Sequence, residues 1–154
     1  SGHRPIGAVC AMRLLVLTIL CCLLGACDAG DRPPTAPQLS DFRGQWIVIN
    51  YWAKWCKPCI EEIPELNKLD AEHDQIAVLG VNYDGAQGID LAQQLEDLGV
   101  EFPTLLVDPT IELGIARPMV LPTTIILDPE GNISKTLIGP QTVASLVAAT
   151  VSRQ

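Results

Sequence analysis

Apolar residues after position 38 change their spacing several times along the chain, and each spacing predicts an element. Residues 46–52 and 76–82 are continuous apolar runs rich in β-prone side chains, which is typical of strands buried on both faces. Between them, apolar residues recur every three positions from 60 to 69 and predict a helix with one buried face. Pro64 lies inside that helix, and we expect it to cause a kink.

In the second half of the domain, predicted helices and strands continue to alternate. Leucines between 91 and 98 predict a helix that ends at Gly99. The remaining pattern predicts a strand at 102–107, a short helix at 108–113, a strand at 123–127 joined by a turn to a strand at 132–138, and a closing helix at 143–151. Alternating strands and helices followed by a hairpin and a helix predict one α/β domain with a mixed central sheet between helices.

The first 38 residues follow another pattern. Met12-Arg13 precedes an apolar run of about ten residues that ends at Gly25-Ala26-Cys27, as in a secretory signal. The run is shorter than the roughly 20 residues that span a membrane. We therefore expect a remnant or misassigned start at 1–11, a signal peptide at 12–26, a polar, proline-rich tether at 27–38 and the folded domain at 39–154.

The end of the signal carries a more specific indication. Leu24-Gly25-Ala26-Cys27 resembles a bacterial lipoprotein box, which implies lipidation of Cys27 and a membrane anchor. Asp28 directly after the cysteine favours the periplasmic side of the inner membrane. The alternatives are the outer membrane, a secreted soluble form released by a plain signal, and an uncleaved anchor.

Composition and charge argue against some classes of protein. The 154 residues include 10 Lys and Arg against 18 Asp and Glu, a formal charge of −8, which argues against a nucleic-acid-binding surface. Of six cysteines, four lie in the first 27 residues, so a disulfide-stapled domain is not indicated. Only Cys56 and Cys59 belong to the domain, which we expect to be a monomer.

The motif Cys56-Lys57-Pro58-Cys59 lies between a predicted buried strand and a predicted helix, which is the context of a redox pair. Unpaired N–H groups at the helix start stabilise a thiolate, Lys57 adds positive charge, and Pro58 suits the first turn. We expect Cys56 to be the exposed nucleophile and Cys59 the more buried resolving thiol, with no cofactor beyond this pair. A structural disulfide and a zinc site are the alternatives, and the zinc site lacks a second ligand pair.

Residues 50–59, followed by 61–66, are similar to the thioredoxin-like proteins of the TlpA/ResA type, and residues 121–133 match the second signature of that family. The resemblance implies a thioredoxin-like three-layer α/β/α sandwich with a mixed central sheet. It also implies that residues 83–115 contain the helix–strand insertion of this branch. The implied activity is extracytoplasmic thiol–disulfide exchange.

The resemblance also implies residue roles. Pro122 matches the cis-proline, and the backbone of Leu121 would pair with an extended substrate segment. Glu62 matches the active-site acid, Asn50 stands where thioredoxins proper carry a buried acid, and Trp55 would cover the cysteine pair. An ordinary trans proline at 122 and a solvated helix residue at 62 are the alternatives.

The leading hypothesis is reduction of disulfides in extracytoplasmic proteins, such as cytochrome c maturation or copper-site assembly substrates. Electrons would come from a membrane donor of the DsbD/CcdA kind. The Lys-Pro dipeptide lacks the histidine of strongly oxidising pairs, which favours a reductant. The alternatives are a peroxiredoxin-type peroxidase, whose Pro-x-x-x-Thr/Ser-x-x-Cys segment neither cysteine has, and a copper-binding module, which lacks a Met or His cluster.

Overall fold

The computed structural model describes residues 36–151. The predicted signal peptide and Cys27, with all of the predicted tether up to residue 35, lie outside the described residues. The elements, in chain order, are η1 (Leu39–Phe42), β1 (Trp46–Trp52), α2 (Lys57–Glu72), β2 (Ile76–Asn82), α3 (Gly88–Leu98), β3 (Thr104–Leu105), α4 (Thr110–Leu113), β4 (Thr123–Leu127), β5 (Ile133–Ile138) and α5 (Val143–Val151).

The five strands form one mixed sheet in the order β3-β2-β1-β4-β5. Strands β1, β2 and β3 are parallel, β4 runs antiparallel to β1, and β5 runs antiparallel to β4. Three strands begin and end where the apolar runs predicted. The predicted strand at 102–107 is wrong in length, because only Thr104 and Leu105 pair with β2. Pro103 has no N–H for a ladder, and Val107 is 79% exposed, so apolar character there does not mean pairing.

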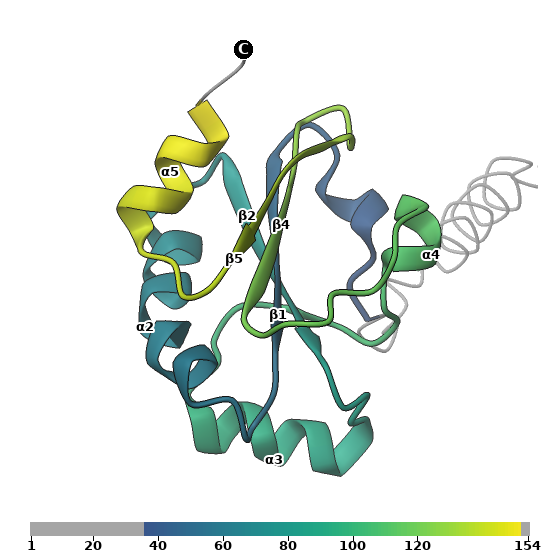
Figure 1. Cartoon of the computed structure of the whole chain (residues 1–154), viewed down its shortest axis with the longest axis vertical. Helices are drawn as coiled ribbons and strands as arrows, with labels where there is room; N and C mark the ends of the chain where they lie inside the picture. Colours follow the sequence, from purple (N-terminus) through teal and green to yellow (C-terminus); the bar gives the residue numbers. More distant parts are fainter. Residues whose placement is uncertain (1–35, 152–154) are drawn as a thin grey trace, which may run out of the picture. The chain divides into compact units, whose positions relative to one another are not determined.

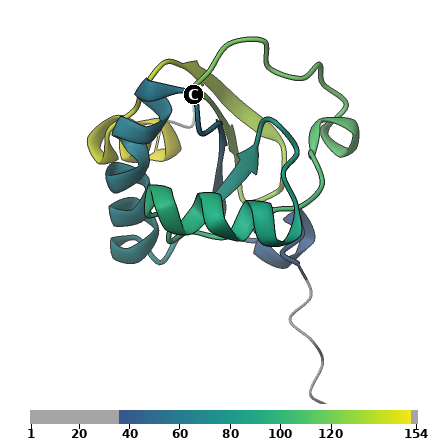
Figure 2. The ribbon, with the colours of Figure 1, turned by 90° about the horizontal axis from the view of Figure 1, so that it is seen from below.

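Helices lie on both faces of this sheet. Figures 1 and 2 show α2 and α5 side by side against one face, and η1 and α4 beyond the other. Helix α3 crosses the end of the sheet at which β1 leads into α2 (Figure 1). The arrangement confirms the predicted thioredoxin-like α/β/α fold, and α3 and β3 fall within the segment expected to hold the insertion. Helix α2 continues through Pro64 without a break.

Side chains along β1 point alternately to the two faces of the sheet and so belong to two separate core clusters. Val48 packs with residues of α2 and α5, including Leu66 and Leu146, whereas Ile47, Ile49 and Tyr51 pack with the cluster on the opposite face. Successive side chains of a strand point to opposite faces, so Asn50 lies on the α2 side and Tyr51 on the other. A polar residue thus comes to lie beneath the helix that starts with the cysteine motif.

Candidate redox site

Cys56 and Cys59 form a disulfide at the start of α2. Their sulfurs are 2.05 Å apart and their Cα atoms 5.3 Å apart. Cys56 is the N-cap of α2, Pro58 lies in its first turn, and the backbone N–H of Cys59 donates to Sγ of Cys56 at 3.3 Å. Proline suits this position because the first turn of a helix leaves its N–H groups unpaired. The same free donors face any negative charge that develops on Cys56.

Both cysteines are largely covered by apolar side chains. Cys59 is fully buried, and Cys56 is 4% exposed. The two pack in one cluster with Trp52, Ala53 and Leu91, against which Leu121 also packs. The expectation of an exposed Cys56 is therefore wrong in degree, since α3 and the segment before β4 lie close enough to cover it. The predicted order of accessibility, with Cys59 the more buried, is confirmed.

Glu62 is a buried carboxylate on the same helix. It lies one turn after Cys59, is 2% exposed, and accepts two hydrogen bonds. Oε1 accepts from Nδ2 of Asn50 at 2.7 Å, and Oε2 accepts from the backbone N–H of Gln141 at 2.8 Å. Burial raises the pKa of Glu62 above its usual value, although these two hydrogen bonds act in the opposite direction. The alternative of a solvated helix residue is excluded.

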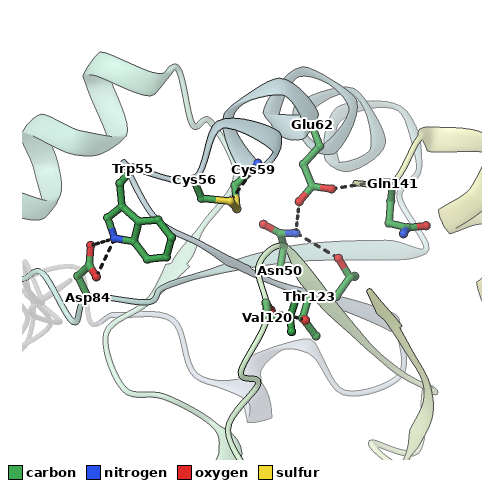
Figure 3. The surroundings of a disulfide bond; sticks show 10 residues. Asn50, Trp55, Cys56, Cys59, Glu62, Asp84, Val120, Thr123 and Gln141 are labelled. Atoms are coloured by element: carbon green, nitrogen blue, oxygen red, sulfur yellow. Dashed lines mark hydrogen bonds between the residues drawn. A yellow bond between two sulfur atoms is a disulfide. The ribbon is translucent and has the colours of Figure 1, made fainter. Parts of the chain in front are cut away.

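Asn50 connects Glu62 to the sheet. It is fully buried on β1, and its Nδ2 also donates to Oγ1 of Thr124 at 3.1 Å. The sheet register places Thr124 directly opposite Asn50 in the antiparallel pair of β1 and β4. Figure 3 shows Asn50 between the disulfide region and Glu62, with Gln141 approaching from the far side. Helix α2, strand β1 and the loop before α5 therefore meet at this carboxylate, and β4 is linked to it through Asn50.

Two of the predicted site residues, Lys57 and Trp55, lie at the exposed rim of the redox site. Lys57 is exposed, and its Nζ is 3.7 Å from Oε1 of Glu61. Lys57 therefore forms an ion pair with Glu61. Trp55 is 62% exposed, and its indole N–H donates to the Asp84 carboxylate, with distances of 3.1 and 3.0 Å to the two oxygens. In Figure 3 the indole lies beside the motif, turned toward Asp84. Its role in covering the cysteines stays a prediction.

The peptide bond between Leu121 and Pro122 is cis, as the resemblance implied. Pro122 is buried and its carbonyl accepts from the N–H of Gly139 at 2.9 Å. Leu121 is half-buried and packs against the cluster that contains the disulfide. The structure thus brings this pair to the cysteines from about 60 residues further along the chain, although its role in substrate binding stays a prediction.

Several participants were not identified from the sequence. Gln141 contributes a backbone N–H, which no side-chain pattern reveals. Thr124 could have been found only from the register of β1 and β4. Asp84 lies two residues after the end of β2, and the ends of parallel strands meet at one edge of a sheet, so its position in the sequence indicated a place near the motif.

Within 36–151 there is no group of three or more His, Cys, Asp or Glu side chains that could hold a metal ion. No helix in this part of the chain is both long and apolar enough to cross a membrane.

Comparison with known proteins places this geometry among related chains. The chain is 35% identical over 107 residues to the thioredoxin-like protein YneN of Bacillus subtilis, a match that covers 68% of this chain and 62% of YneN. It is 31% identical to the thiol-disulfide oxidoreductase ResA of Geobacillus thermodenitrificans, covering 68% and 61% of the two chains. The chain therefore spans about three fifths of the length of these curated relatives.

Structural similarity leads to the same group. The crystal structure of StoA from Bacillus subtilis matches with a TM-score of 0.56 and 27% identity, covering 70% of this chain and 83% of StoA. The model of the AhpC/TSA family matches residues 32–136, which include the cysteine pair, Glu62 and the cis-proline. With its thioredoxin-like sheet and its redox-type cysteine motif, the chain belongs to the AhpC/TSA family.

Proposed function

We propose that this protein is a thiol–disulfide oxidoreductase that reduces disulfides in partner proteins. The observation that carries the proposal is the Cys56–Cys59 disulfide at the start of α2, packed beside Leu121 and one turn from the buried Glu62. A structural disulfide needs neither a buried acid nor free helix N–H groups beside it. Relatives named as thiol-disulfide oxidoreductases support the same activity.

The disulfide is the product of the proposed reaction. In the reduced protein, the Cys56 thiolate attacks one sulfur of the partner disulfide, forms a mixed disulfide and releases one partner thiolate. The Cys59 thiolate then attacks Sγ of Cys56, which releases the second partner thiolate and restores the Cys56–Cys59 bond. Two electrons pass to the partner, which takes up two protons. The N–H of Cys59 points at Sγ of Cys56 and stabilises its charge.

Glu62 is suited to hold the proton of Cys59. The buried thiol must lose its proton before it attacks, and a carboxylate with a raised pKa on the same helix face can accept it. Asn50 keeps Glu62 in place, because one amide group bonds both the carboxylate and Thr124. Trp55 and the Leu121–Pro122 segment would contact the partner polypeptide at the rim.

The finer proposal concerns place and electron source. The lipoprotein-like box at Cys27 supports anchoring at the periplasmic side of the inner membrane. Because that space is oxidising, a reductant there needs electrons from a membrane donor of the DsbD/CcdA kind. Proteins that receive haem or copper at cysteines are the proposed partners. Replacing Cys27 by Ser should release the protein from membranes, and a variant that stays bound would contradict lipidation.

Insulin reduction with dithiothreitol as electron source tests the activity. Cys56→Ser should abolish turnover, because no mixed disulfide can form. Cys59→Ser should still attack but accumulate the mixed disulfide, which mass spectrometry detects as an added partner mass. Unchanged turnover by Cys56→Ser would overturn the mechanism.

Three further measurements separate the alternatives. The reduction potential of the Cys56–Cys59 couple distinguishes a reductant from a disulfide donor, since a strongly oxidising value would reverse the proposed direction. Peroxide consumption by the purified protein, without a partner disulfide, would favour the peroxidase. Metal analysis of the reduced protein would reveal a copper-binding module.

A further inference from the structure

Arg117 ties the segment that leads into Leu121 to the rest of the domain. Its Nε donates to Oδ2 of Asp108 at 2.7 Å, and its Nη2 donates to the carbonyl oxygen of Tyr83 at 2.6 Å. The guanidinium also lies over the Tyr83 ring, with 4.0 Å between Cζ and the ring centroid. A planar guanidinium can make directional hydrogen bonds and stack at the same time, which an ammonium cannot.

Asp108 is itself held from three directions. Besides Arg117, its Oδ1 accepts from the hydroxyl of Tyr51 at 2.8 Å and from the N–H and hydroxyl of Thr110 at 3.0 and 2.9 Å. Burial by itself would raise the pKa of Asp108, but the hydrogen bonds from Arg117, Thr110 and Tyr51 together hold it below its usual value. The carboxylate is therefore an ionised, fixed anchor for Arg117.

Tyr83 links this anchor to the redox motif. Its backbone N–H donates to the carbonyl of Trp52 at 2.8 Å, at the last residue of β1 and four residues before Cys56. Its hydroxyl donates to the carbonyl of Pro118 at 3.0 Å. Tyr83 and Leu121 pack against the same two apolar clusters. One residue thus contacts both the strand that carries the cysteines and the segment that precedes the cis-proline.

The segment itself needs such support. Residues 114–122 connect α4 to β4 without regular secondary structure, and Figure 2 shows them as a long outer connection. Met119 is 93% exposed and Val120 is 53% exposed, so their apolar side chains are displayed next to Leu121. An untied connection of this length would sample many conformations and lose entropy on binding a partner.

We propose that Arg117 is a positioning residue, which with Asp108 and Tyr83 holds residues 117–121 in place relative to the Cys56–Cys59 pair and so determines how tightly a protein substrate is bound. This inference rests on the proposed reduction of partner disulfides. Arg117 touches neither sulfur and takes no part in the electron transfer. Its loss should therefore weaken binding of a polypeptide while leaving the chemistry of the pair intact.

The test compares a protein disulfide with a small one. For Arg117→Gln we expect the KM for insulin to rise about tenfold with little change in kcat, because the binding segment loses its order. The rate at which the reduced protein reacts with the small disulfide 5,5′-dithiobis(2-nitrobenzoate), and the reduction potential, should stay at their wild-type values. Arg117→Lys keeps the positive charge but cannot make both guanidinium hydrogen bonds or stack on Tyr83. It should therefore recover only a small part of the lost affinity for insulin.

Arg43→Gln is the matched control, since it removes the same charge from an exposed position and should leave the KM unchanged. An unchanged KM in Arg117→Gln, or equal losses with the protein and the small disulfide, would overturn the positioning role. Amide hydrogen exchange gives a readout that does not depend on turnover: residues 119–121 should exchange faster in Arg117→Gln while β1 and β2 keep their protection. If the wild type reduces no protein disulfide, the proposed function fails. Unchanged exchange at 119–121 in Arg117→Gln would separately overturn the positioning role of Arg117.

Discussion

Replacing Glu62 by glutamine tests whether burial controls the charge of this carboxylate. Below the usual glutamate pKa, both the folded and the unfolded protein hold the proton, and the residue contributes no pH dependence. As the pH rises above that value, the unfolded state releases the proton first, because the folded-state pKa is raised. Stability from this residue therefore falls with rising pH until the pH passes the folded-state pKa. Glutamine does not titrate, so the variant lacks this fall.

The structure also sets the size of the effect. Glutamine keeps the volume of Glu62 but accepts with one oxygen only, so one of the bonds from Asn50 and Gln141 is lost, at about 1 kcal/mol. At acid pH the hydroxyl oxygen of the protonated Glu62 can still accept a hydrogen bond, whereas the amide nitrogen of glutamine cannot, so the variant should be less stable by up to about that amount. With rising pH the wild-type advantage should shrink by about 1.4 kcal/mol for each unit by which the pKa is raised. Glu62→Ala removes the acceptor of the Gln141 N–H and one of the two acceptors of Asn50 Nδ2, and it leaves a cavity, so it should cost about 2–4 kcal/mol.

Urea unfolding of the oxidised protein, followed by tryptophan fluorescence from about pH 4 to about pH 9, measures these differences. Glu61→Gln is the control, since it makes the same chemical change at the exposed neighbour on the same helix. A constant difference between wild type and Glu62→Gln would refute the reasoning. A wild-type advantage that grows with pH would show that the bonds from Asn50 and Gln141 outweigh burial.

Three further predictions concern stability. Gly80→Ala should cost about 1–3 kcal/mol in urea unfolding, because its Cβ would lie 2.9 Å from Nε1 of the buried Trp52, and an unchanged midpoint would mean that this side chain moves freely. Asp108→Asn should lower the urea midpoint at neutral pH, and the difference should shrink as the pH falls through the lowered pKa of Asp108; a difference that persists in acid would rule out a role for its charge. Reducing the Cys56–Cys59 bond should destabilise the domain by about 2 kcal/mol, since the loop it closes is short, and calorimetry with and without dithiothreitol would detect a larger loss if the disulfide held tertiary structure.

Much of the fold follows from local pattern. Strands β1, β2 and β4 occupy the predicted ranges, because continuous apolar runs bounded by polar residues have few other ways to be buried. The same reasoning failed at 102–107, where Leu106 and Val107 are apolar yet exposed. Their exposure depends on where β3 stops pairing with β2, and this depends on the neighbouring strand rather than on the segment itself.

The sequence by itself determined the redox pair, since the chemistry of Cys56 and Cys59 depends on their spacing and on the helix that starts between them. Only the tertiary structure decided the state of Glu62. Three acids lie close together on α2; the family resemblance singled out Glu62, but the local sequence pattern does not show that Glu62 is buried and Glu61 exposed. Asn50 and Gln141 meet at Glu62, and Thr124 holds Asn50, because strand pairing and helix packing bring together residues that are far apart in the chain. The charge and proton affinity of Glu62 depend on these surroundings, because desolvation and hydrogen bonding act through space and not along the sequence.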